Sequence, residues 1–292
     1  CPWLRRILVA MNEPSRMPVV PEGAEPGEVI EMPRPKRRGL YVLPNAITLA
    51  ALFASFYGVV MAMNGRFELA CIAIFAAAVL DSLDGRVARM THAQSAFGEQ
   101  MDSLCDMVGF GAAPALIVYE WALKGLGKLG LIAAFVYCAA AALRLARFNT
   151  NIGIVDKRYF QGLPSPAAAA LVVGLIWVMD DAGFRNVFAD EPWLAWIAFG
   201  VTLYAGLTMV TNAPFYSFKV WGGRRSVPFA VIVAIALLIA LVNVHPPLVL
   251  FAMFCLYGLS GYVVYGWRKA KGQRTSVIAT STDEPEEQGL HP

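Results

Sequence analysis

The chain has 292 residues, of which 58% are hydrophobic and 15% are charged, and its mean hydropathy is +0.55. These values exclude a water-soluble globular domain, because a soluble surface of this size needs more charged and polar side chains than the chain supplies. The formal net charge of +3 at pH 7 is too small to indicate nucleic-acid binding, so we expect no nucleic-acid partner.

Residues 1–40 combine scattered charges, frequent prolines and no sustained apolar stretch. Such a segment cannot bury enough apolar surface to offset the entropy of ordering it. It therefore predicts a disordered N-terminal arm. Residues 271–292, which are rich in acidic and small polar residues, predict a disordered tail for the same reason. Between them, residues 41–270 are expected to form one membrane domain.

Apolar stretches follow one another along almost the whole of that domain. A transmembrane helix needs about 20 mostly apolar residues, and about eight stretches reach or approach this length. The sequence predicts an all-α integral membrane protein built as a bundle of about eight transmembrane helices. The expected spans are 43–63, 67–90, 98–122, 127–148, 164–180, 193–211, 227–243 and 247–266.

Lysine and arginine residues gather in alternate connections between these spans. By the positive-inside rule, the connections that hold them face the cytoplasm. The pattern places the arm and the tail in the cytoplasm and the protein in the cytoplasmic (inner) membrane. The inner groups fall at 34–38, 86–89, 144–158, 219–225 and 268–274, whereas the outer connections hold Arg66, Lys124, Lys128 and Arg185.

Four aspartates lie inside otherwise apolar stretches, where an isolated charge is costly. Asp81 and Asp84 are three residues apart on the second expected helix, and Asp102 and Asp106 are four apart on the third. Residues at these spacings share one face of a helix. A short turn near 91–97 lets the two helices run antiparallel, so the acidic faces are expected to converge near the cytoplasmic side.

Converging carboxylates repel one another and need positive charge between them. Arg86 and Arg89 are too few to neutralise all four and also leave room for a ligand. Oxygen-only ligands suit hard divalent cations, so we expect the four aspartates to hold two Mg²⁺ or Mn²⁺ ions. The structural alternative is that the aspartates pair with Arg86, Arg89 or helix ends and only hold the bundle together.

The string DSLDGRVARMTHAQSAFGEQMDSLCD at 81–106 resembles the signature of the CDP-alcohol phosphatidyltransferase family. LPNAITL at 43–49 extends the resemblance toward the N-terminus. RLARFNT at 144–150, FQGLPSP at 160–166 and FYSFK at 215–219 resemble the phosphatidylserine synthase branch of that family. The fixed positions of the signature are Asp81, Asp84, Gly85, Ala88, Arg89, Gly98, Asp102 and Asp106.

The resemblance implies a transferase that moves the phosphatidyl group of CDP-diacylglycerol to L-serine, giving phosphatidylserine and CMP. In such an enzyme, Asp81, Asp84 and Asp102 would coordinate the metal ions. Asp106 would both contact the second ion and act as the general base. A polar cavity would open to the cytoplasm and the inner leaflet, so that the acyl chains stay among membrane lipids. Family members form homodimers, which we expect here as well.

The resemblance also assigns residues around the aspartates to the nucleotide end of CDP-diacylglycerol. Small residues at Gly85 and Ala88 would let the nucleotide approach the helix backbone, and Arg89 would contact a phosphate. The alternatives are helix packing for the small residues and helix capping for Asn45 and Ser95. The assigned residues are Asn45, Thr48, Gly85, Ala88, Arg89 and Ser95.

A serine acceptor presents a carboxylate, an ammonium group and a hydroxyl, and its carboxylate calls for a cation near the third and fourth helices. Arg144 and Arg147 lie one turn apart on the fourth helix, close to Asn149 at its cytoplasmic end. Lys219 follows later in the chain. We predict that these four residues bind serine; the alternative is that the cations are positive-inside anchors.

Two other functions stay open at this point. An inositol phosphate or glycerol phosphate acceptor would use the same chemistry, but it would need extra basic residues for its second phosphate. An ion-coupled transporter would also place acidic residues inside the membrane. Transporters usually show related halves, however, and we find no internal repeat in the sequence.

Overall fold

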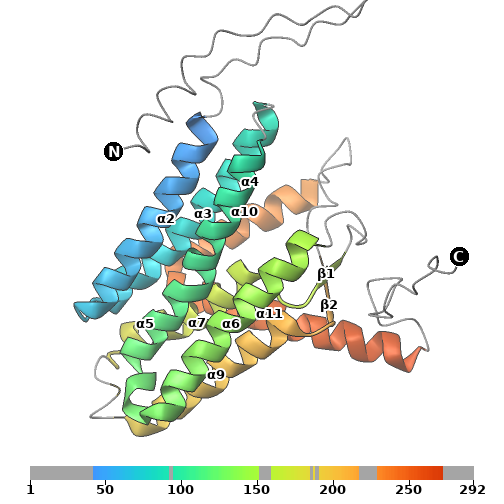
Figure 1. Ribbon diagram of the computed structural model, residues 1–292. Coiled ribbons are helices and arrows are strands. Elements are labelled where there is room, and N and C mark those ends of the chain that lie inside the picture. The colour runs from blue at the N-terminus through green and yellow to red at the C-terminus, as the bar shows by residue number, and fades with distance from the viewer. Residues whose placement is uncertain are drawn as a thin grey trace, which may run out of the picture. The chain divides into compact units, whose positions relative to one another are not determined.

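The computed structural model describes residues 42–91, 95–150, 159–184, 187, 191–216 and 229–271. The predicted arm at 1–40 lies outside these residues, and so does the predicted tail apart from Lys271. Helices make up most of the described chain, which confirms an all-α protein (Figure 1).

A helix coincides with each of the predicted spans. One span, 98–122, is divided: α4 and α5 are joined by a π-helix at Met107–Ala112 into one continuous helical stretch. The helices are α2 (Val42–Met63), α3 (Phe67–Met90), α4 (Ala96–Asp106), α5 (Ala113–Trp121), α6 (Lys128–Thr150), α7 (Ser165–Asp181), α9 (Pro192–Val210), α10 (Phe229–Val244) and α11 (Pro246–Ala270).

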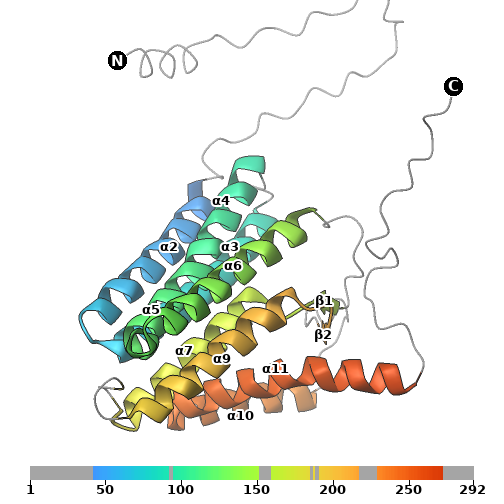
Figure 2. The ribbon, with the colours of Figure 1, turned by 60° about the horizontal axis from the view of Figure 1, so that its bottom comes forward.

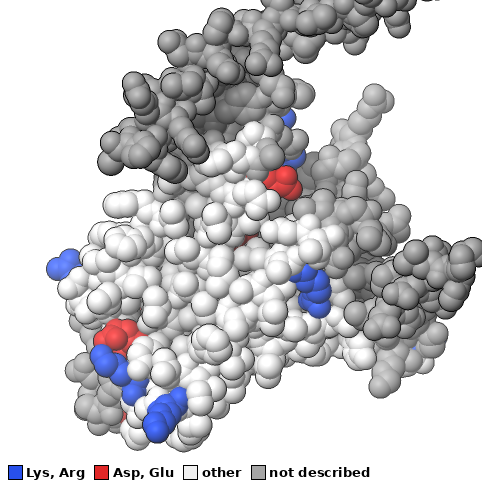
Figure 3. Space-filling view, viewed as in Figure 1, with Lys and Arg blue, Asp and Glu red and all other residues white. Residues whose placement is uncertain are grey.

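Five helical stretches among the described residues are long and apolar enough to cross a membrane. They are Leu43–Met63, Phe97–Trp121, Lys128–Thr150, Pro192–Val210 and Pro246–Trp267. α7 and α10 have 17 and 16 residues, short of the about 20 that a span needs. In Figure 3, charged side chains form small patches on a mostly uncharged described surface. The structure thus supports an integral membrane protein, and the count of eight spans stays a prediction.

The helices pack through small residues. α2 packs along α3, α6 along α9, and α7 contacts α3, α9 and α11 (Figures 1 and 2). Glycine permits the closest of these approaches: a Cβ atom on Gly206 of α9 would lie 3.0 Å from the Cα atom of Tyr137 on α6. Without a hydrophobic force between helices in lipid, such close contact is a main source of their association.

The π-helix at Met107–Ala112 begins directly after Asp106. Tyr137, a fully buried residue of α6, donates a hydrogen bond from its hydroxyl to the Phe110 carbonyl oxygen at 3.0 Å. A backbone carbonyl in apolar surroundings needs such a partner. Tyr137 therefore fixes the segment that follows Asp106, and π-helices are often found at functional sites.

A two-stranded antiparallel sheet joins two loops that lie far apart in the sequence. β1 (Tyr159–Gln161) pairs with β2 (Pro214–Tyr216), with Phe160 opposite Phe215. The first residues of the strings FQGLPSP and FYSFK thus lie side by side. Gly162 follows β1 with φ +75°, and its N–H donates to the Ala213 carbonyl oxygen at 3.0 Å.

Gly162→Ala should destabilise the protein far more than Gly65→Ala. Both glycines have positive φ, +75° and +71°, where alanine costs about 1–2 kcal/mol. A Cβ atom at Gly65 meets nothing within 4 Å, whereas at Gly162 it would lie 2.3 Å from the Met209 carbonyl oxygen. Unfolding midpoints of the two variants in one detergent, followed by circular dichroism, measure the difference. Equal midpoints would contradict this close approach of β1 to the end of α9.

Candidate active site

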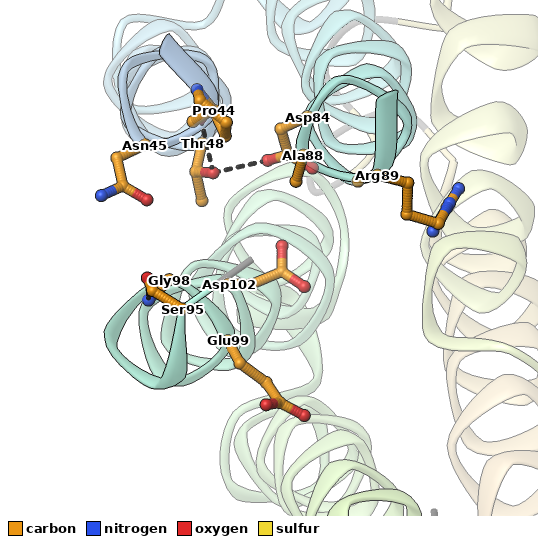
Figure 4. Close-up of a pocket in the computed structure, with 11 residues that line it drawn as sticks. Pro44, Asn45, Thr48, Asp84, Ala88, Arg89, Ser95, Gly98, Glu99 and Asp102 are labelled. Atoms are coloured by element: carbon orange, nitrogen blue, oxygen red, sulfur yellow. Dashed lines mark hydrogen bonds between the residues drawn. The ribbon is translucent and has the colours of Figure 1, made fainter. Parts of the chain in front are cut away.

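A pocket of about 480 Å³ lies between α2, α3 and the start of α4 (Figure 4). All six residues that the sequence assigned to the nucleotide line it, together with two of the four aspartates. The signature glycine Gly98 lines it as well. Pro44 and Glu99 complete the lining and were not predicted, although Glu99 directly follows Gly98 in the sequence. The lining residues are Pro44, Asn45, Thr48, Asp84, Gly85, Ala88, Arg89, Ser95, Gly98, Glu99 and Asp102.

Asp84 is buried in the pocket wall, with 3% of its surface exposed. Its Oδ2 atom accepts a hydrogen bond from Thr48 Oγ1 at 2.7 Å (Figure 4). The same hydroxyl lies 3.1 Å from the carbonyl oxygen of Pro44, one turn earlier. Thr48 therefore links α2 to α3 and fixes the orientation of this carboxylate.

Ser95 and Asn45 differ in how they relate to helix ends. Ser95 caps α4, because its Oγ accepts a hydrogen bond from the Gly98 N–H at 3.0 Å. The capping alternative is thus observed for Ser95, which also lines the pocket. Asn45 lies within α2, which begins at Val42, so it does not cap that helix. A Cβ atom on Gly98 would lie 3.2 Å from Ser95 Oγ and 3.3 Å from Asn45 Oδ1.

Gly85 faces open space rather than a packed helix. Among the described atoms, a Cβ at this position would contact Arg89 Nη1 alone, at 3.7 Å, outside its own helix backbone. That distance is an ordinary van der Waals contact. Helix packing therefore does not require a glycine here, and the missing side chain instead enlarges the pocket.

Asp81, Asp102 and Asp106 form a carboxylate cluster. Each offers one oxygen, and the three oxygens lie within 4.8 Å of one another. The acidic faces of α3 and α4 thus converge as the helical spacing predicts. Asp84 lies outside this cluster, in the pocket wall, whereas Asp102 belongs to both the cluster and the pocket.

The cluster fits a divalent cation in chemistry and spacing. Oxygen ligands bound to one Mg²⁺ at about 2.1 Å are at most about 4.2 Å apart, so only a small inward movement is needed. Asp106 Oδ1 is buried and has no hydrogen-bond partner among the described residues. No lysine or arginine of the described chain forms a salt bridge with any of the four aspartates. Pairing with Arg86 or Arg89 is therefore not what neutralises them here.

Arg144 is a buried cation near Asp106. Its side chain on α6 is 8% exposed, and its Nη1 atom donates a hydrogen bond to Ser165 Oγ on α7. It interacts electrostatically with Asp106 and with Tyr257 of α11. Its Nε atom is buried without a hydrogen-bond partner among the described residues.

Arg147, one turn later on α6, has a different environment. Its Nη1 atom donates to the Val210 carbonyl oxygen at 3.1 Å and to Asn212 Oδ1 at 3.2 Å. Its Nη2 atom donates to the carbonyl oxygens of Gln161 and Met209, both at 3.3 Å. These bonds satisfy the last carbonyls of α9 and tie that helix to the small sheet.

The other two predicted serine-binding residues are placed differently. Asn149 donates from Nδ2 to Ser103 Oγ at 3.1 Å, which joins the end of α6 to α4 beside Asp102. Lys219 lies outside the described residues. Arg144 and Asn149 thus lie toward the aspartate-bearing helix, whereas the hydrogen bonds of Arg147 go to α9 and to the residues around the sheet.

Together, the fold and the site define an all-α membrane protein with a carboxylate cluster beside a polar pocket. The sequence model of CDP-alcohol phosphatidyltransferases matches residues 41–204. This match covers more than half of the chain and includes the cluster and the pocket. The chain belongs to the CDP-alcohol phosphatidyltransferase family.

Three curated relatives share the name CDP-diacylglycerol–serine O-phosphatidyltransferase. The Helicobacter pylori protein is 33% identical over 227 residues, which cover 78% of this chain and 90% of the relative. The Methanocaldococcus jannaschii protein is 34% identical over 193 residues, covering 65% of this chain and 82% of the relative. The Mycobacterium leprae protein is 39% identical over 150 residues, covering 49% and 50%.

Proposed function

We propose that this protein transfers the phosphatidyl group of CDP-diacylglycerol to L-serine, releasing CMP. The observation that carries the proposal is the shared site: the residues assigned to the nucleotide line one pocket, and this pocket shares Asp102 with the carboxylate cluster. The names of relatives at 33% and 34% identity support serine as the acceptor.

Asp106 is the proposed general base. It would accept the proton of the serine hydroxyl as the hydroxyl oxygen attacks the β-phosphorus. A new P–O bond forms to serine, the bond from the β-phosphorus to the CMP oxygen breaks, and CMP leaves with the electron pair. We favour direct displacement, because metal binding and proton transfer use all four aspartates and leave no nucleophile.

Asp81, Asp84 and Asp102 would hold two divalent ions, Mg²⁺ or Mn²⁺, with Asp106 touching the second. Bound ions would neutralise the pyrophosphate and stabilise the leaving CMP. Thr48 would keep the Asp84 carboxylate oriented through the hydrogen bond described above. Arg89, from the pocket lining, would contact a phosphate of the lipid nucleotide.

Arg144 is the residue whose position best supports serine binding, since it is buried beside the proposed base. Arg147 already donates to the α9 carbonyls, so we expect it to contribute to stability in addition to any contact with the acceptor. The serine-binding predictions for Asn149 and Lys219 stay predictions.

We also propose eight spans, a homodimer, and a cytoplasmic location for the pocket and both chain ends. The distribution of basic residues supports the orientation. Reporter fusions at the C-terminus test it, because a reporter active only outside the cytoplasm should stay inactive there. Crosslinking in intact membranes tests the dimer, since a single band at the monomer mass would contradict it.

Purified protein in detergent should release CMP from CDP-diacylglycerol only when L-serine and Mg²⁺ or Mn²⁺ are both present. The comparison arms are inositol phosphate, glycerol phosphate and no acceptor. Stimulation by one of these alcohols would keep the aspartate chemistry and overturn the acceptor. Release that needs no divalent ion, or no release with any acceptor, would overturn the proposed function. The ion-coupled transporter would then be the favoured alternative.

Asp106→Asn should abolish turnover while retaining much of the binding of CDP-diacylglycerol. Asp81→Asn and Asp84→Asn should lose divalent-dependent binding as well, because asparagine keeps the size of the side chain but removes its charge. Binding of radiolabelled CDP-diacylglycerol and the rate of CMP release measure the two effects. Asp181→Asn, at the far end of α7, serves as the control. Equal loss of binding in all three site variants would contradict the base assignment.

Gly85→Ala should raise the KM for CDP-diacylglycerol by about tenfold or more, equivalent to about 1.4 kcal/mol of binding. The added methyl group enters the pocket without clashing with a neighbouring helix. Alanine within a helix should also leave the unfolding midpoint equal or raised. Gly200→Ala on α9, where a Cβ meets nothing within 4 Å, is the matched control. An unchanged KM in both variants would show that the nucleotide does not approach Gly85.

A further inference from the structure

Asp106 and Arg144 are opposite charges that lie near each other inside the bundle without forming an ion pair. They interact electrostatically, yet no nitrogen of Arg144 lies within 4.0 Å of an Asp106 carboxylate oxygen. Each has a buried polar atom with no partner among the described residues, Asp106 Oδ1 and Arg144 Nε. A buried cation and a buried anion would ordinarily gain from direct contact, so the arrangement needs an explanation.

Ser165 supplies the contact that holds the guanidinium. It is the first residue of α7, it is fully buried, and its Oγ accepts the hydrogen bond from Arg144 Nη1. The backbone leading into it is constrained: Pro164 has the fixed φ of proline, and the Leu163 N–H donates to the Thr208 carbonyl oxygen on α9 at 3.1 Å. Ser165 therefore anchors one end of the guanidinium to the start of α7.

Two further elements, α11 and β2, contribute to the surroundings of Arg144. Tyr257 of α11 interacts with it electrostatically and donates from its hydroxyl to the Tyr216 carbonyl oxygen at 3.2 Å. The Tyr257 ring also packs on Phe215 of β2, with centroids 5.7 Å apart. Arg144 thus connects the three strings that resemble the serine branch: it lies in the string on α6, binds the start of α7 directly, and reaches β2 through Tyr257.

We propose that Ser165 is a positioning residue that holds Arg144 in place to receive the carboxylate of the amino-acid acceptor, while the hydroxyl of that acceptor reaches Asp106. This inference rests on the proposed function and deepens it. Arg144 Nε then gains a charge-assisted hydrogen bond, and Asp106 Oδ1 accepts one from the hydroxyl. Ser165 itself touches neither the acceptor hydroxyl nor the phosphorus.

The acceptor class follows from this arrangement. A small hydroxy amino acid satisfies both buried charges at once. An alcohol without a carboxylate, such as ethanolamine, would leave Arg144 desolvated and unpaired. The site should therefore bind such an alcohol much more weakly than serine. Without Ser165, the guanidinium is free to turn toward Asp106, and the acceptor must then compete with an internal ion pair.

Ser165→Ala is expected to raise the KM for L-serine about tenfold or more, with the KM for CDP-diacylglycerol unchanged. Ser165→Thr keeps the hydroxyl and should restore most of the serine affinity. Ser55→Ala is the matched control, because Ser55 is equally buried but its hydroxyl donates within its own helix, to the Ala51 carbonyl oxygen at 3.0 Å. This control should leave both KM values unchanged.

A double-mutant cycle separates positioning from general loss of structure. Arg144→Gln alone should raise the KM for serine, and adding Ser165→Ala to it should change that KM no further, because Ser165 acts through Arg144. Should Ser165→Ala fail to fold, the near-isosteric Ser165→Cys takes its place with the same expectation.

Serine-dependent CMP release by the unaltered protein supports the proposed function, and its absence overturns that function. Given such release, a wild-type serine KM in Ser165→Ala, an equal rise in both KM values, or additive effects in the cycle overturns the positioning role alone.

Discussion

Negative charge buried among apolar helices is the constraint on which the rest of this structure depends. Asp81, Asp102 and Asp106 repel one another, and no described cation forms an ion pair with them. The scaffold must therefore hold them together by other means, through the packing of α2 on both α3 and α4 and the hydrogen bond of Tyr137 to the segment after Asp106. Oxygens preorganised in this way cost folding stability, and a cation that binds them recovers it.

Two arginines one turn apart on α6 have different hydrogen-bond partners around this site. Arg147 satisfies the last carbonyls of α9 and binds the loops of the small sheet, which stabilises the architecture. Arg144 makes a single described hydrogen bond and keeps its Nε without a partner. A buried cation so sparsely satisfied is expensive, and binding of an anionic group is the usual compensation.

Features that depend on local spacing could be predicted from the sequence. Apolar length located the helices, and the spacing of Asp81, Asp102 and Asp106 with a short turn predicted that they converge. The π-helix could not be predicted from the sequence. Its most distinctive residues are Gly109 and Gly111, and glycine is common in membrane helices that contain no π-helix. Pairing of β1 with β2 and the partners of Arg147 depend on segments far apart in the chain, so no local pattern indicates them.

Asp102 couples the pocket electrostatically to the carboxylate cluster. It lines the pocket and also belongs to the carboxylate cluster, so a charge placed at either location alters the electrostatic potential at the other. Thermodynamic reciprocity then requires each ligand to change the affinity of the other by the same factor. The dissociation constant of an anionic pocket ligand accordingly has no single value, and it has meaning only at a stated concentration of free divalent cation.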